Sequence, residues 1–250
     1  MNKQYFFLCG LPRSGSALLG TILNQNPDIG VYPNSILPDI LYELNNLKNH
    51  DIVQNFPNLN AIQNIINNVF NNYFEDSNKK FIIDRGPWGT PDNLNNLKQV
   101  IRKPKFVILT KPTIDSLASF VHVEKTKDIE KRCDELVHRT GMVGKNLWGI
   151  NYLIQEKEDY LFIWYKDFVA DPKRYIKEIY KFLNIPAFNH QYENFDDYSI
   201  DGLKYDDSVL TKNWHKLNTK KIELPKWETT DIIPASLIKK YKDLKVNEIN

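Results

Sequence analysis

The sequence predicts an α/β fold of three layers, in which a central, mainly parallel sheet of about four to five strands is flanked by helices. Four short runs are almost wholly apolar rather than alternating, which is typical of parallel strands covered on both faces. Helical patterns separate these runs, so right-handed crossovers should join the strands. The four strands are expected at residues 5–9, 80–84, 105–110 and 160–165.

The remaining elements follow from periodicity and from end signals. Helices are expected at 17–24, 36–47, 59–73, 114–123, 175–183 and 235–244, together with a long polar helical stretch at 128–156. Asp171-Pro172 is a start signal for the helix at 175–183, and Pro186 lies just beyond its end. Residues 189–218 are polar without a period and are expected to form a long loop over a site. No repeat or linker interrupts the chain, so residues 1–250 are expected to form a single domain.

Composition excludes several classes of protein. The chain has 33 Lys and Arg against 31 Asp and Glu, a net charge of +2, so no overall basic field attracts nucleic acid or a membrane. Cys9 and Cys133 lie far apart, which argues against a disulfide framework or a zinc site and favours a reducing, cytoplasmic location. The apolar run at 5–9 is too short for a signal peptide, so a soluble protein without membrane insertion is expected. Nothing in the sequence indicates an oligomeric state.

A loop between the first strand and the first helix has the features of an anion site. Backbone N–H groups converge at such a turn, where the helix N-terminus is partly positive. Gly10 and Gly15 have the spacing of a Walker A loop, but Ser16 stands in place of its Lys and Ala17 in place of its Mg²⁺-binding hydroxyl. Arg13 inside the loop supplies a cation instead. We therefore expect anion binding without a metal.

A second anion site is expected where the third predicted strand ends. Lys111 follows this strand, and Ser119 comes eight residues later on the next helix. Both can reach one anion at the carboxyl edge of a parallel sheet. Taken alone, the pair also fits a solvated lysine and an ordinary helical serine. The anion reading is favoured because the first loop lies at the same edge.

These segments resemble the sulfotransferase superfamily, with local motifs most similar to its tyrosylprotein-type and bacterial-type members. Residues 12–16, Pro-Arg-Ser-Gly-Ser, are similar to the family's 5′-phosphosulfate loop, which reads PRSGTT or PKSGTT. Lys111 and Ser119 match its 3′-phosphate motif, with Lys replacing the usual Arg. Residues 163–172 and 180–186 are similar to RYEDLVADP and YEFLGLP, so the resemblance covers most of residues 5–215.

The resemblance implies an enzyme that moves a sulfuryl group from 3′-phosphoadenosine 5′-phosphosulfate (PAPS) and releases adenosine 3′,5′-bisphosphate (PAP), without a metal. The implied acceptor is a hydroxyl or amine of a carbohydrate, a peptide or a small molecule. The expected catalytic residues are Arg13, Arg85 and Ser16. The expected cofactor-binding residues are Arg13, Ser14, Gly15, Ser16, Ala17, Lys111, Ser119, Tyr165 and Lys212.

The general base is the point at which the chain departs from the family. The catalytic Glu of tyrosylprotein sulfotransferases has no counterpart in residues 32–35, and the His of cytosolic members is absent near residue 87. The substitutes Asp84, Asp39, His122 and His215 leave the base unassigned. Two other functions therefore stay open, a P-loop nucleotide kinase and a catalytically silent module that binds PAPS or PAP.

Overall fold

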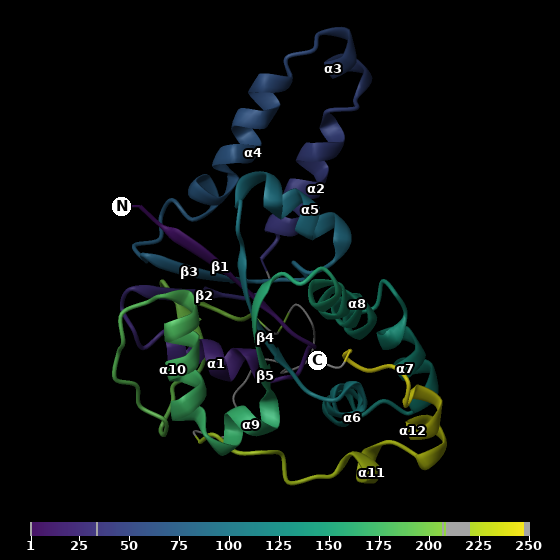
Figure 1. Ribbon diagram of the computed structural model, residues 1–250. Helices are drawn as coiled ribbons and strands as arrows, with labels where there is room; N and C mark the ends of the chain where they lie inside the picture. The colour runs from purple at the N-terminus through teal and green to yellow at the C-terminus, as the bar shows by residue number, and fades with distance from the viewer. Residues whose placement is uncertain (1, 34, 207, 209–220, 248–250) are drawn as a thin grey trace.

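The computed structural model describes residues 2–33, 35–206, 208 and 221–247, and the statements below concern these residues. Its centre is a parallel sheet of five strands in the order β2-β3-β1-β4-β5 (Figure 1). The strands are β1 Gln4–Cys9, β2 Ile29–Tyr32, β3 Phe81–Arg85, β4 Lys105–Thr110 and β5 Asp159–Trp164. A separate antiparallel pair consists of β6 Ser199–Ile200 and β7 Leu203–Lys204.

Helices connect the strands and cover the sheet. They are α1 Ser16–Leu23, α2 Leu37–Leu47, α3 Asp51–Asn55, α4 Leu59–Tyr73, α5 Pro91–Val100, α6 Thr113–Glu124, α7 Ile129–Val137, α8 Met142–Gln155, α9 Tyr165–Ala170, α10 Pro172–Leu183, α11 Thr229–Ile232 and α12 Ala235–Tyr241. Among the described residues, no helix is both long and apolar enough to span a bilayer.

Two hydrophobic cores lie on the two faces of the sheet because successive strand residues point to opposite sides. On one face, Phe6 and Leu8 of β1 pack with buried residues of α1, α9 and α10. On the other, Phe7 and Cys9 pack with α2, α4, α5, α6 and α8. The three-layer α/β fold predicted from continuous apolar strands is thereby confirmed.

All four predicted strands are present as β1, β3, β4 and β5, and the helix predicted at 59–73 coincides with α4. The sequence reading missed β2, an edge strand of only four residues, and α5, whose residues are mostly polar. The prediction of one long helical stretch at 128–156 was wrong, since two helices occupy it: α7 ends at Val137 and α8 begins at Met142. The predicted loop at 189–218 contains the β6–β7 hairpin within its described part.

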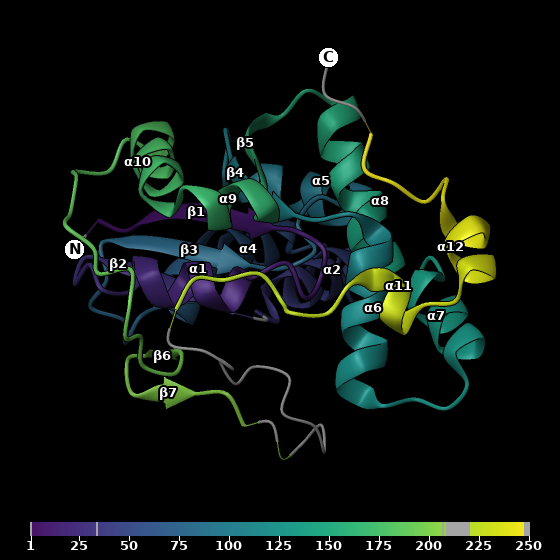
Figure 2. The ribbon, with the colours of Figure 1, turned by 90° about the horizontal axis from the view of Figure 1, so that it is seen from below.

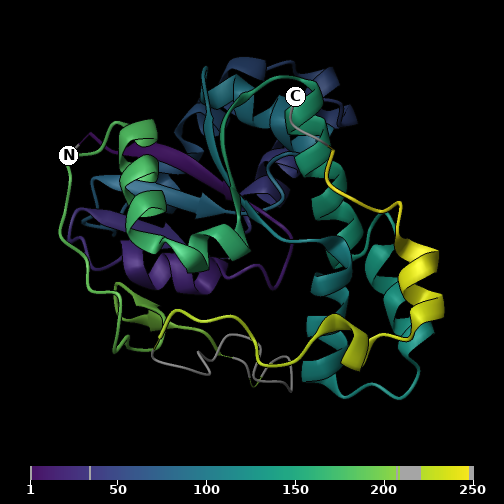
Figure 3. The same cartoon turned by 60° about the horizontal axis from the view of Figure 1, so that its bottom comes forward.

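Two parts extend from this body. Helices α2, α3 and α4 project from it, at the top of Figure 1. The segment after residue 220 runs past α1 toward α11, and α12 then lies beside α7 (Figures 2 and 3). The hydroxyl of Tyr241 donates to Asp134 at 2.7 Å, which fixes α12 on α7. Residues 221–247 therefore cover the side of the molecule on which α6 lies.

Candidate active site

The loop predicted to bind an anion lies at the carboxyl end of β1, in the middle of the sheet. Gly15 caps α1 with a φ of 81°, in the left-handed region that suits glycine. The helix's first backbone bond runs from Leu19 N to Gly15 O at 2.9 Å. The N–H groups before it have no carbonyl within the helix. Ser16 and Ala17 thus lie at the positive end of α1, where an anion is stabilised.

The loop is attached to α6 through two hydroxyl groups. Ser116 Oγ donates to the carbonyl oxygen of Pro12 at 2.6 Å. Arg13 Nε donates to Ser119 Oγ at 3.3 Å, although the two residues are 106 positions apart in the chain. The backbone of Arg13 has a φ of 68°, which is uncommon for a residue with a side chain. The structure therefore joins the two predicted anion sites, and Arg13 is the residue that connects them.

Lys111 lies at the end of β4, in the same part of the site. Burial lowers the pKa of Lys111 to about 8; the negative charge of Asp115 opposes this shift, and the positive charge of Arg13 adds to it. Asp115 itself accepts a hydrogen bond from Thr229 Oγ1 at 2.5 Å, which ties α11 to the start of α6. Two cations, Arg13 and Lys111, and the carboxylate of Asp115 thus lie in this region.

Tyr165 follows β5 and is the first residue of α9 rather than the last of the strand. Its ring lies against the phosphate loop, because a Cβ built on Gly15 would be 2.3 Å from Tyr165 Cε2. Burial raises the pKa of Tyr165, and the charge of Arg13 opposes that shift. The structure thus places the tyrosine predicted to contact the nucleotide beside the loop predicted to hold its 5′-phosphate.

Arg85 ends β3, and backbone hydrogen bonds fix the turn that follows it. Gly86 N donates to Leu8 O at 3.3 Å, and Ser35 N donates to Arg85 O at 3.2 Å. The Arg85 side chain is partly buried, and its charge acts on the hydroxyl of Tyr198, whose pKa is raised mainly by burial. Arg85 is therefore at the same edge of the sheet as the phosphate loop.

The proposed substitutes for the base lie in different surroundings. Asp84 is fully buried and accepts a hydrogen bond from Trp88 Nε1 at 2.9 Å. Burial raises the pKa of this carboxyl well above its ordinary value, and the side chains of Trp88 and Ser35 oppose the shift. Asp39 is exposed in the first turn of α2. The exposed ring of His122 packs on Trp227, with centroids 5.2 Å apart. Of these three side chains, that of Asp84 is inaccessible, whereas those of Asp39 and His122 are exposed.

Two predicted residues fall outside the described part of the chain, namely Lys212 and His215. Within it, the structure brings Arg13, Lys111 and Ser119 together and places Tyr165 against Gly15. Sequence reasoning missed the contribution of Ser116, which holds the loop from α6. Its position three residues before Ser119 on the same helix is the signal that indicates it.

Ser14 adds a feature expected of an anion site. Its side chain is fully buried, and no described residue forms a hydrogen bond with its Oγ. Buried hydroxyls are normally paired, so a donor held inside the loop fits a ligand oxygen. No group of three or more His, Cys, Asp or Glu in the described chain could hold a metal ion.

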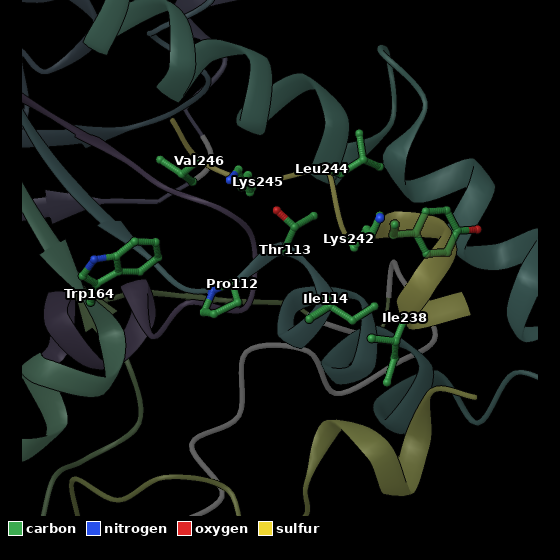
Figure 4. A pocket seen from close by; sticks show the side chains of 10 residues that line it. Pro112, Thr113, Ile114, Trp164, Ile238, Lys242, Leu244, Lys245 and Val246 are labelled. Carbon is green, nitrogen blue, oxygen red and sulfur yellow. The ribbon is translucent and has the colours of Figure 1, made fainter. Parts of the chain in front are cut away.

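A groove of about 330 Å³ lies at the start of α6 (Figure 4). Its lining is mainly apolar and includes Trp164, Ile238 and Val246, with Thr113 between them. None of the predicted site residues lines it. The groove thus shares no lining residue with the predicted site, although Pro112 and Trp164 are direct chain neighbours of Lys111 and Tyr165.

Three comparisons bear on this arrangement. A family model described as "Sulfotransferase family" matches residues 6–190. Among curated proteins, none matches the chain significantly. Solved structures with the same fold include the sulfotransferase domain from the curacin biosynthetic pathway, with a TM-score of 0.60, 17% identity, and coverage of 100% of this chain and 94% of that one. A sulfotransferase from Alicyclobacillus acidocaldarius has a TM-score of 0.52 and 14% identity, covering 76% and 85% of the two chains.

Proposed function

Since this chain belongs to the sulfotransferase family, we propose that it takes its sulfuryl group from PAPS and transfers that group to a hydroxyl or amine acceptor. The single observation that carries the choice of donor is the contact between Arg13 and Ser119. It joins a loop suited to a 5′-phosphosulfate with a strand end suited to a 3′-phosphate. A donor that carries both groups on one nucleotide matches this pair of sites.

The described residues fit such a donor. The Ser14 hydroxyl and the N-terminus of α1 would hold the 5′-phosphosulfate, and Lys111 and Ser119 the 3′-phosphate. Tyr165 would pack against the nucleotide beside Gly15. PAPS, when bound, supplies an activated sulfuryl group whose leaving group is the 5′-phosphate of PAP. Lys212 remains part of the prediction as a further cation, outside the described residues.

Catalysis is proposed to rest on charge and position. Sulfuryl transfer, like phosphoryl transfer, is favoured by cations and N–H donors near the oxygens that gain negative charge. Arg85, at the end of β3, is the second cation proposed near the leaving phosphate, and Ser16 lies at the start of α1. Arg13 was predicted from the sequence to act at the leaving phosphate. We keep the base unassigned, because Asp84 is fully buried and the structure does not single out either of the exposed side chains of Asp39 and His122.

The acceptor belongs to the proposal only as a class, a carbohydrate, peptide or small molecule with a hydroxyl or amine. A reducing, cytoplasmic setting is also proposed. It agrees with Cys9 and Cys133, which are both free and buried. Because burial raises the pKa of Cys9 to about 12 and that of Cys133 to about 11, both thiols should resist oxidation.

Calorimetry of PAP against ATP with magnesium tests the donor without knowledge of the acceptor. Micromolar binding of PAP together with weak or no binding of Mg-ATP supports the proposal. A preference for Mg-ATP would replace it with a P-loop kinase. Tight PAP binding without sulfate transfer from labelled PAPS to a broad acceptor panel would instead indicate a silent binding module.

A further inference from the structure

The groove at the start of α6 has no role in the proposed transfer, because none of the predicted site residues lines it (Figure 4). Its volume of about 330 Å³ lies within the range of about 300–1,000 Å³ that is typical of small-molecule sites. Two large apolar side chains of its lining stay accessible, since Trp164 is 39% and Leu244 37% exposed. The groove therefore offers apolar contact area to a small ligand.

One polar group in this mainly apolar lining lacks a hydrogen-bond partner. Thr113 is only 3% exposed, and its Oγ1 forms no hydrogen bond with any residue that the structure describes. Figure 4 shows this oxygen directed across the groove toward Lys245 and Val246. Buried hydroxyls are normally paired, because an unpaired one has lost its water without compensation. A ligand oxygen in the groove would supply the missing partner.

The charge of the lining favours an anion. Lys242 and Lys245 are the charged side chains among the described residues that line the groove, and no acid is present beside them. Asp243, between them in the chain, does not line it. Neither lysine takes part in an ion pair within the described chain. A cleft whose charges have one sign raises the local concentration of ions of the opposite sign.

The wall of the groove that carries Lys245 is held in place by α8. Asn151 donates through Nδ2 to the carbonyl oxygen of Lys245 at 3.1 Å, and its Oδ1 accepts a hydrogen bond from Asn247 N at 2.8 Å. Val246 lies between these two bonds and is 7% exposed. A site whose walls are fixed before binding loses less conformational entropy when a ligand enters. The groove is therefore preformed on this side.

We propose that this groove is a second ligand site, which binds a small amphipathic anion. The apolar body of the ligand packs on Trp164 and Ile238, and its charged head lies between Lys245 and the hydroxyl of Thr113. An anionic oxygen, such as that of a carboxylate, can accept from both groups at once. The site is additional to that of the nucleotide, and the inference does not depend on the identity of the sulfuryl donor.

The test compares octanoate with octan-1-ol, which have apolar chains of the same length and differ in the charge of the head. Calorimetry on the full chain should show that octanoate binds about 10-fold more tightly, as expected for a charged hydrogen bond. Lys245→Gln should remove most of this preference and leave the affinity for octan-1-ol unchanged. A wild type that binds octanoate no more tightly than octan-1-ol would overturn the inference.

Thr113→Val tests the second contact, because it replaces the hydroxyl by a methyl group of similar size. The affinity for octanoate should fall about 3- to 10-fold. The free energy of unfolding of the unliganded variant should not fall, since this hydroxyl has no partner to lose among the described residues. Unchanged octanoate binding in the folded variant would contradict the position of the charged head.

Lys239→Gln is the matched control, since Lys239 is exposed on α12 beside Ile238 and does not line the groove. It should leave octanoate binding unchanged. Lys111→Gln separates the groove from the predicted phosphate site and should also leave it unchanged. A loss in Lys111→Gln as large as that in Lys245→Gln would place octanoate at the phosphate site and overturn the inference. Because octanoate is measured without nucleotide, a wild type that fails to bind PAP would contradict the proposed donor alone.

Discussion

The indole N–H of Trp88 donates to the carboxyl of Asp84 at 2.9 Å, which ties the turn after β3 to the end of that strand. Both side chains are fully buried. Asp84 pairs in register with Phe7 of β1, so the bond lies on the face of the sheet away from α1. It fixes the path of the chain directly after Arg85. Burial raises the pKa of this carboxyl well above 3.8, which favours its neutral form.

Asp84→Asn should therefore preserve the fold, whereas Asp84→Ala should lower the free energy of unfolding by about 1–3 kcal/mol because the Trp88 N–H loses its partner. A folded-state pKa raised above the unfolded value contributes stability that is fully present below pH 3.8 and is lost as pH rises through the folded pKa. The Asp84→Asn variant should lack this decline in stability with rising pH. Denaturant unfolding between pH 4 and pH 8 measures both effects.

The asparagine variant also addresses catalysis. Sulfate transfer that persists in Asp84→Asn would remove Asp84 from the substitutes for the base. A variant that is folded, binds PAP and does not transfer would instead show that the carboxyl group of Asp84 is required for the transfer step.

The contact between Gly15 and Tyr165 can be tested with Gly202 as the control, since both glycines have a φ near 80°. A Cβ on Gly15 would lie 2.3 Å from the Tyr165 ring, while one on Gly202 would have nothing within 4 Å. Both Gly→Ala changes should cost about 1–2 kcal/mol of backbone strain. Only Gly15→Ala should also displace Tyr165 and weaken PAP binding. Calorimetry on the two folded variants measures their affinity for PAP. Equal affinity would show that Tyr165 does not contact the nucleotide.

How far the sequence predicts this molecule depends on the strength of each local signal. β1 and β4 were predicted because both faces of these strands are buried, which leaves uninterrupted apolar runs. β2 was missed because four residues containing a glycine give no such run. α5 was missed because only two of its apolar residues, Leu94 and Leu97, are buried, which leaves little helical periodicity.

The candidate site, too, could be predicted from the sequence only in part. Local sequence predicted one anion at the loop that contains Arg13 and a second anion at Lys111 and Ser119, and the resemblance to the family implied that the first is the 5′-phosphosulfate. The contact of Arg13 with Ser119 joins residues 106 positions apart. No local pattern encodes it, because the direction of a long side chain depends on how the loop and α6 pack. The base could not be predicted for a similar reason, since burial decides the protonation of Asp84.

A largely buried ion pair should stabilise the helices behind the anion site. Arg132 of α7 donates through Nε and Nη2 to both oxygens of Glu124 on α6, each at 2.7 Å, and the Glu124 side chain is only 2% exposed. Arg132→Ala would leave that carboxylate buried without its fork, at a cost of up to about 3 kcal/mol. The exposed pair Lys240–Glu130 is the comparison. Denaturant unfolding should show a clearly smaller loss for Glu130→Gln, and similar losses would contradict the role of burial.

The affinity for PAP should fall as pH rises through about 8, the pKa of Lys111 in the free protein. A bound 3′-phosphate favours the protonated ammonium, so binding above this pH requires uptake of a proton and becomes weaker by up to tenfold per pH unit. The phosphate groups themselves are fully ionised there, since their second pKa is about 6. Arg13, the other charged group that lowers the pKa of Lys111, stays protonated throughout.

Lys111→Arg is the decisive variant, because an arginine does not titrate in this range. Calorimetry from pH 7 to pH 10 should show a sloping affinity for the wild type and a flat one for Lys111→Arg, with the arginine variant binding at least as tightly at pH 9. Proton uptake measured in buffers of different ionisation enthalpy should be present above pH 8 in the wild type and absent in the variant. A wild type whose affinity is flat over this range would place Lys111 away from the bound phosphate.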